Sequence, residues 1–217
     1  MRFAYDYNIT ISYNIITTVS GIFEIMDNPE HHLVTIPKEF HSFEKEGLFT
    51  NCIECNRDLL DGSCDYVIEK AIRNYKGYKA EDVIFDYAIC MKCALDVQQS
   101  LSRESLISIQ QYMEQNMRVE ERVKQMTYLK EDHTRFVEEC LVSSEPKNAC
   151  DEYQIFAYCR GDKMNLDMPP YMISGKILNE ISELLSNETR DELNGFFNKH
   201  FSPAPGMFEP DPRLILI

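Results

Sequence analysis

Two pairs of cysteines are the residues of this sequence whose type and spacing most clearly predict chemistry. Cys52 and Cys55 flank two residues in the stretch CIEC, and Cys90 and Cys93 flank two residues in the stretch CMKC. Zn²⁺ prefers four soft ligands at the corners of a tetrahedron, and two such pairs supply all four. Because four thiolates leave no open position for a reacting water, the site would be structural. We therefore predict one structural Zn²⁺ bound by Cys52, Cys55, Cys90 and Cys93.

The residues around the pairs indicate how each pair is positioned. The first pair fits a tight turn, and Asn56 follows it at a place where the backbone often needs a positive φ. The second pair is expected at the start of a helix, where positions i and i+3 share a face and the helix N-terminus favours a thiolate. Arg57 and Lys92 lie next to ligands, so they are either partners of the negatively charged site or ordinary surface residues.

Two other interpretations of the cysteines remain open. A C-x-x-C pair at a helix start is also typical of thiol-disulfide oxidoreductases, although these need one pair within a βαβ unit and this chain has two pairs without that unit. The remaining cysteines could form a second site, but their spacing gives no ligand pair, which favours buried free thiols. They are Cys64, Cys140, Cys150 and Cys159.

The segment between the pairs predicts a β-hairpin. Residues 65–75 and 81–90 are rich in β-branched and aromatic residues, and a glycine-containing stretch separates them. Residues 50–101 resemble the treble-clef class of four-cysteine zinc modules. In that class a turn with two metal ligands is followed by a β-hairpin and by a helix that carries two more ligands. The resemblance implies ligand roles for the four cysteines alone, and Ile53 and Asn56 stand where the class commonly has proline and glycine. Nucleases of this class carry histidines on the hairpin, and this hairpin has none.

A second candidate site lies at the tip of that hairpin, within residues 70–79. Basic and aromatic side chains alternate there without an acid, which is a pattern that holds single-stranded nucleic acid by charge and stacking. The same pattern also keeps a hairpin soluble and discourages edge pairing. The candidate contact residues, for nucleic acid or for a protein partner, are Lys70, Arg73, Tyr75, Lys76, Tyr78 and Lys79.

The rest of the chain predicts an α+β fold with five parts. Residues 1–49 form an N-terminal extension, in which 1–25 are either an over-called start before Met26 or a strand pair. The zinc domain spans 50–101, and the Gly- and Pro-free region 102–142 predicts helices capped first by Ser102. Residues 150–201 predict a small unit of strands and helices, with Ser174 and Ser186 as caps, followed by a Pro-rich tail at 202–217. The chain outside residues 50–101 resembles an uncharacterised bacterial type of protein, and this resemblance implies no activity.

The charge and composition of the chain argue against several classes of function. The formal net charge of −14 opposes binding to duplex nucleic acid and to anionic lipid. No apolar run is long enough to span a membrane and no signal peptide is apparent, so eight cysteines point to a reducing cytoplasm. No P-loop, G-x-S-x-G or H-E-x-x-H motif occurs. We expect a non-enzymatic zinc-stabilised module for protein interaction or regulation, which could self-associate through its helical segment. The alternative function is single-stranded nucleic-acid binding. A further alternative is thiol-disulfide oxidoreduction.

Overall fold

One antiparallel sheet organises the protein. The computed structural model describes residues 33–75, 80–117 and 133–201. Within these residues the sheet has six strands in the order β1-β5-β4-β2-β3, and β6 pairs with β4 beside that path. The strands are β1 (Leu33–Thr35), β2 (Asp65–Asn74), β3 (Glu81–Cys90), β4 (Glu152–Arg160), β5 (Lys163–Asn165) and β6 (Tyr171–Ser174).

The predicted hairpin is present as β2 and β3. Their register pairs Tyr66 with Cys90 and Lys70 with Asp86, and a bulge interrupts the ladder next to Ala71. β2 lies between β3 and β4, and its residues 66–72 are buried on both faces. Its sequence therefore reads as a continuous apolar run with two charges rather than as an alternation of apolar and polar residues.

The sheet continues from the cysteine-containing hairpin into the 150–201 segment. β4 pairs with β2 along nearly its whole length, from Asp65 opposite Arg160 to Arg73 opposite Glu152. The sequence divides the chain into a zinc domain and a separate small unit, whereas these strands share one hydrogen-bonded ladder. The physical reason is that the backbone N–H and C=O groups along both edges of β2 need hydrogen-bond partners. β3 pairs with one edge, and the apolar strand YQIFAYC pairs with the other.

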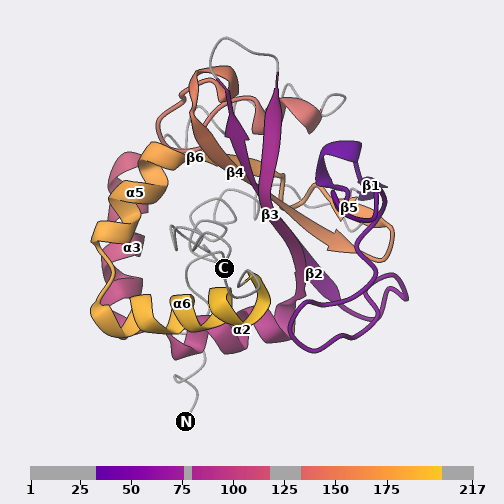
Figure 1. The fold of residues 1–217 in the computed structure, drawn as a ribbon, viewed down its shortest axis with the longest axis horizontal. Helices are drawn as coiled ribbons and strands as arrows, with labels where there is room; N and C mark the ends of the chain where they lie inside the picture. Colours follow the sequence, from indigo (N-terminus) through magenta and orange to yellow (C-terminus); the bar gives the residue numbers. More distant parts are fainter. Residues whose placement is uncertain (1–32, 76–79, 118–132, 202–217) are drawn as a thin grey trace, which may run out of the picture.

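Helices surround one side of this sheet (Figure 1). Ser102 caps α3 by accepting from the backbone N–H of Ser105, as predicted, and Ser174 and Ser186 stand directly before α5 and α6. The α-helices are α2 (Met91–Ser100), α3 (Arg103–Asn116), α5 (Gly175–Glu183) and α6 (Asn187–Phe201). Single 3₁₀ turns occur at η2 (Lys38–Phe40), η3 (His133–Val137) and η4 (Lys147–Ala149). None of the described helices is long and apolar enough to cross a membrane.

The predicted helical region 102–142 differs at its end. Residues 118–132 lie outside the described part of the chain, and after η3 the chain joins the sheet rather than continuing as an α-helix. Cys140 forms a parallel bridge with Met172, and the N–H of Leu141 donates to the carbonyl of Met172 at 2.8 Å. The apolar spacing here serves a short extended segment against β6, which periodicity alone does not distinguish from a helix face.

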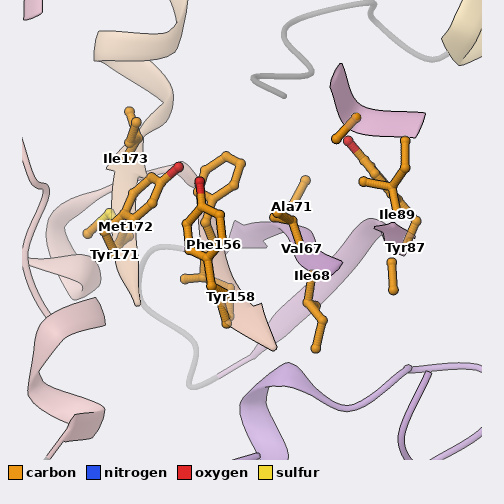
Figure 2. Close-up of a cluster of buried hydrophobic side chains, with 14 of the residues drawn as sticks. Val67, Ile68, Ala71, Tyr87, Ile89, Phe156, Tyr158, Tyr171, Met172 and Ile173 are labelled. Carbon is orange, nitrogen blue, oxygen red and sulfur yellow. The ribbon is translucent and has the colours of Figure 1, made fainter. Parts of the chain in front are cut away.

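The two faces of the sheet are packed by different parts of the chain. Phe85 and Tyr87 on β3 contact aromatic rings of α6, with ring centroids 5.3–6.1 Å apart within this cluster. On the other face the ammonium of Lys70 donates to the carbonyl of His41, next to η2, at 2.7 Å. Figure 2 shows Phe156 beside Tyr171, and Ile68 directed away from its neighbour Val67, as the period of a strand requires. The core therefore consists of two layers separated by the sheet.

Candidate metal centre

The four cysteines of the two pairs meet at one point. The sulfur atoms of Cys52, Cys55, Cys90 and Cys93 all lie within 4.8 Å of one another, and the Cys55 and Cys90 sulfurs are 3.9 Å apart. A tetrahedral ion with metal–sulfur bonds of 2.3 Å places its sulfurs about 3.8 Å apart. Three of the four residues are buried and Cys55 is exposed. The donor set and its spacing therefore fit a four-thiolate metal site.

A tight turn positions the first pair. The N–H of Asn56 donates to the carbonyl of Cys52 at 2.9 Å, and the N–H of Cys52 donates to the carbonyl of Arg57 at 3.0 Å. Asn56 has a φ of 58°, which is the left-handed conformation predicted for this position. The N–H of Ile53 donates to the carbonyl of Ala88 at 2.9 Å, so the turn is attached to the edge of β3.

The end of β3 and the start of α2 position the second pair. Cys90 is the last residue of β3 and the N-cap of α2, and Cys93 lies in the first turn of that helix. The backbone N–H of Cys90 donates to the sulfur of Cys52 at 3.3 Å. Such N–H donors stabilise the negative charge that thiolate ligands carry. One hydrogen bond thus joins the second pair to the first.

The electrostatic surroundings of the four thiols are uneven. The backbone N–H of Arg57 lowers the pKa of Cys55 to about 7, whereas burial raises the pKa of Cys90 and of Cys93. The guanidinium of Arg57 interacts with the sulfurs of Cys64 and Cys55, which raises the pKa of Arg57. Arg57 and Lys92 are both exposed, and Arg57 is the one of the two that interacts with the cysteines, as a basic neighbour of the site. A metal cation would supply the positive charge that the buried thiolates need.

The other cysteines stand apart from this cluster. Within the described residues, which include all eight cysteines, the only metal-competent group is the one formed by the two pairs. Cys140 accepts a hydrogen bond from the N–H of Ser174 at 3.3 Å, and the thiol of Cys150 donates to the carbonyl of Pro146 at 3.5 Å. Burial raises the pKa of Cys159 to about 12. These thiols behave as packed core residues.

The structure places three of the six basic and aromatic residues of the hairpin tip. Lys70 is buried, and its ammonium lies 3.7 Å from the carboxylate of Asp86. Arg73 forms an ion pair with Glu152 at 2.7 Å, and the hydroxyl of the exposed Tyr75 donates to Asp82 at 2.7 Å. Lys70 therefore does not belong to an exposed basic patch. Lys76, Tyr78 and Lys79 lie outside the described residues.

A contact that the sequence did not suggest joins the first cysteine turn to the last helix. Glu54, between Cys52 and Cys55, pairs with Lys199 and lies 2.6 Å from the ring nitrogen Nε2 of His200. The ammonium of Lys199 contributes most to holding the pKa of Glu54 below its ordinary value. No local pattern could reveal this contact, because it joins residues that are 145 and 146 positions apart.

No known family model, curated protein or solved structure matches this chain. The class of the protein therefore follows from its own fold and site. It is an α+β protein in which four cysteines, from a turn, a strand end and a helix start, form a cluster whose geometry fits a metal ion.

Proposed function

We propose that this chain is a non-enzymatic protein-interaction or regulatory module stabilised by one structural Zn²⁺. The single observation that carries the proposal is the four-cysteine cluster, because four thiolates complete a tetrahedron and leave no position for substrate. The order of ligand turn, hairpin and helix supports a treble-clef type of zinc module. Eight free thiols support a role in a reducing compartment such as the cytoplasm.

The exposed surface supports interaction with another protein. Large apolar or aromatic side chains remain between 41% and 68% exposed, outside the two packed layers of the core. Scattered exposed apolar residues are ordinary, so these positions show where contacts are available rather than proving any of them. They are Leu33, Phe43, Tyr75, Ile84 and Ile107.

Metal content tests the zinc part of the proposal. Protein purified without chelator should contain about one zinc per chain, and Cys90→Ser should lose both the zinc and cooperative unfolding, because metal binding and folding are coupled. Cys150→Ser is the matched control, since it changes a buried thiol outside the cluster and should retain the zinc. Full zinc in Cys90→Ser, or no metal in the unaltered chain, would refute the structural site.

Site-specific photo-crosslinking tests the interaction part. A photoreactive amino acid is introduced into the chain in cells, one position at a time, at Phe43, Ile84 or Ile107, with exposed Gln99 on α2 as the polar control. We expect a discrete protein adduct from at least one apolar position and none from the control. Absence of adducts at all three positions would count against an interaction module.

A further inference from the structure

The described residues cover the outer edge of β3 along only part of its length. β3 is the last strand in the sheet order, so one of its two edges has no neighbouring strand among the described residues. From Ala88 onward the cysteine turn covers that edge, because Ile53 donates to the carbonyl of Ala88 and the N–H of Cys90 donates to Cys52. Backbone groups of an antiparallel strand alternate in direction, so Asp86 also directs its N–H and carbonyl outward. Between Glu81 and Asp86, no backbone hydrogen bond from another described segment reaches this outer edge.

Two exposed apolar side chains accompany the uncovered edge. Ile84, the residue of the β3 bulge that has no partner on β2, is 41% exposed, and Phe43 is 68% exposed. The N–H of Phe43 donates to the side chain of Asp86 at 2.6 Å, which fixes Phe43 beside the strand. Because Asp86 lies two residues from Ile84, about 7 Å along a strand, this hydrogen bond holds Phe43 near Ile84.

Among the described residues, the exposed charges around this edge are mostly acidic, while Asp86 itself forms an ion pair with the buried Lys70. Glu81 and Asp82 are exposed at the start of β3, and the loop that carries Phe43 also exposes Glu44 and Glu46. Lys45, in that loop, donates to the hydroxyl of Thr50 at 3.3 Å. The net charge of −14 adds a long-range field of the same sign. A partner segment with basic side chains is therefore complementary to this edge.

The same charges disfavour a second copy of the chain. Pairing two β3 edges in antiparallel orientation about Ile84 would place Asp82 of each copy opposite Asp86 of the other. Like charges directly opposite each other destabilise a strand pair, and acids on an edge strand are a known protection against such pairing. The acidic side chains of this edge thus disfavour pairing with a second copy of the chain and favour pairing with a basic partner segment.

We propose that β3 between Glu81 and Asp86, together with Phe43, binds an extended segment of a partner protein that alternates basic and apolar residues, as an additional strand of the sheet. Backbone hydrogen bonds to the uncovered edge would provide affinity. Contacts of apolar side chains with Ile84 and Phe43, and of basic side chains with the surrounding acids, would provide specificity. This inference rests on the proposed protein-interaction function and names its surface and its class of partner.

A synthetic probe tests the inference on the zinc-containing full chain. The probe is a fluorescent eight-residue peptide of alternating Lys and Val, and its binding is measured by anisotropy in about 0.15 M salt. Two N-methylated isomers are compared with this peptide: one is methylated on the backbone nitrogens of its Lys residues, the other on those of its Val residues. Because backbone N–H groups alternate in direction along a strand, each isomer lacks hydrogen-bond donors along one edge and keeps the charge of the parent peptide. We expect one isomer to bind like the parent peptide and the other at least tenfold more weakly.

Two substitutions of isoleucine locate the binding surface. Ile84→Lys should weaken binding of the parent peptide at least tenfold, whereas Ile107→Lys, at 42% exposure on α3, should change it less than twofold. Because both variants add the same charge, nonspecific attraction to an acidic protein cannot produce a difference between them. Equal weakening in both variants, or equal binding of both N-methyl isomers, would overturn the edge-strand proposal.

The possible failures are distinguishable from one another. A dimer of the chain that dissociates in Ile84→Lys would place a second copy at this edge and overturn the basic-segment proposal. Cellular adducts at Ile107 but not at Phe43 or Ile84, together with absent peptide binding, would overturn the edge proposal and leave the protein-interaction function standing. Absence of adducts at every exposed apolar position would refute the function itself.

Discussion

The carboxylate of Glu54 and the imidazole of His200 lie 2.6 Å apart, although 146 positions separate them in the chain. Glu54 belongs to the turn between the first two cysteines, and His200 lies in the last turn of α6. The adjacent Lys199 binds the same carboxylate. The turn that carries Cys52 and Cys55 therefore contacts the C-terminal end of α6, whose aromatic residues pack against β3.

Glu54→Gln should loosen the end of α6 while leaving the cluster intact. The substitution removes the charge that pairs with Lys199, and pairs of this partly exposed kind contribute up to about 1 kcal/mol. Hydrogen exchange should accelerate for amides 196–201, with zinc content unchanged. Glu180→Gln on α5, which alters the exposed contact with the hydroxyl of Tyr112, is the control and should leave those amides unaffected. Unchanged exchange in Glu54→Gln would show that the aromatic packing alone holds α6.

The left-handed backbone at Asn56 supports a second prediction. Asn56→Ala should be less stable to urea than Asn56→Gly by about 1–2 kcal/mol, because alanine pays a steric penalty at φ 58° that glycine avoids. Both variants lose the same side-chain amide, so their difference isolates the backbone effect. Unfolding is measured at a fixed free zinc concentration. Equal stability of the two variants would mean that the turn relaxes to a negative φ.

Local features of the cysteine-containing hairpin were accessible from the sequence because local chemistry determines them. The expected strands at 65–75 and 81–90 correspond to β2 and β3 with one boundary shifted by one residue. The cysteine spacing and the tolerance of asparagine for positive φ located the turn, and the i, i+3 pair located the helix start. Each of these signals lies within a few residues of the feature that it predicts.

Features that depend on residues distant in sequence could not be predicted in this way. Lys70 reads as part of a basic segment, but its carboxylate partner Asp86 stands opposite it on the neighbouring strand. The pairing of β4 with β2 joins positions that are 79 to 95 residues apart, and the sequence of neither strand indicates which strand it pairs with. The same limitation applies to Glu54 and His200. Strand pairing and ion pairing are properties of the assembled sheet rather than of a local pattern.

Reciprocal capping of α3 and α6 supports a third prediction. Each N-cap serine donates its backbone N–H to a hydroxyl of the other helix: Ser102 to Thr189 at 2.9 Å and Ser186 to Ser105 at 2.8 Å. The Ser102 and Ser186 hydroxyls also lie 2.8 Å apart. The sequence indicated both caps individually, but their mutual contact exists only because the two helix starts meet in the fold. Figure 1 shows these two helices at one corner of the molecule.

Ser102→Ala and Ser186→Ala should each destabilise the protein by about 0.5–2 kcal/mol, as loss of an N-cap does. Because the two hydroxyls share one network, the double variant should lose less than the sum, with a coupling of about 0.5 kcal/mol or more. The measurement is a double-mutant cycle of urea unfolding. Ser182→Ala on α5, whose exposed hydroxyl donates to the carbonyl of Asn179, is the control and should be near neutral. Strict additivity would indicate that the caps act independently.

A buried carboxyl on β2 supports a fourth prediction, on pH dependence. Glu69 is 1% exposed, and the hydroxyl of Tyr87 donates to one of its oxygens at 2.6 Å. Its other oxygen has no hydrogen-bond partner within the described part of the chain. Burial raises the pKa of Glu69 well above its ordinary value of 4.5, despite the opposing effect of Tyr87. The folded protein therefore retains a proton on Glu69 that the unfolded chain releases above pH 4.5.

Glu69→Gln should consequently become more stable than the unaltered protein as pH rises. Near pH 4 both states of the unaltered protein hold the proton, so the two proteins should differ little. Above pH 4.5 the difference in unfolding free energy should grow in favour of glutamine, by at most about 1.4 kcal/mol per pH unit, and level off once the folded state also ionises. The titration of the cysteine cluster is common to both proteins and cancels in the difference.

Urea unfolding of both proteins between pH 4 and pH 8, at fixed free zinc, measures this difference. Tyr87→Phe keeps the Glu69 carboxyl and removes the hydroxyl that donates a hydrogen bond to it, so this variant should be less stable than the unaltered protein at neutral pH. Its free energy of unfolding relative to that of Glu69→Gln should still depend on pH. A difference between Glu69→Gln and the unaltered protein that stays constant over this range would mean that Glu69 ionises at its ordinary pKa. Water or a cation would then have to reach the carboxyl beneath α6, and the packing of aromatic rings over β3 would be looser than the contacts of Tyr87 with Phe196 and Phe201 indicate.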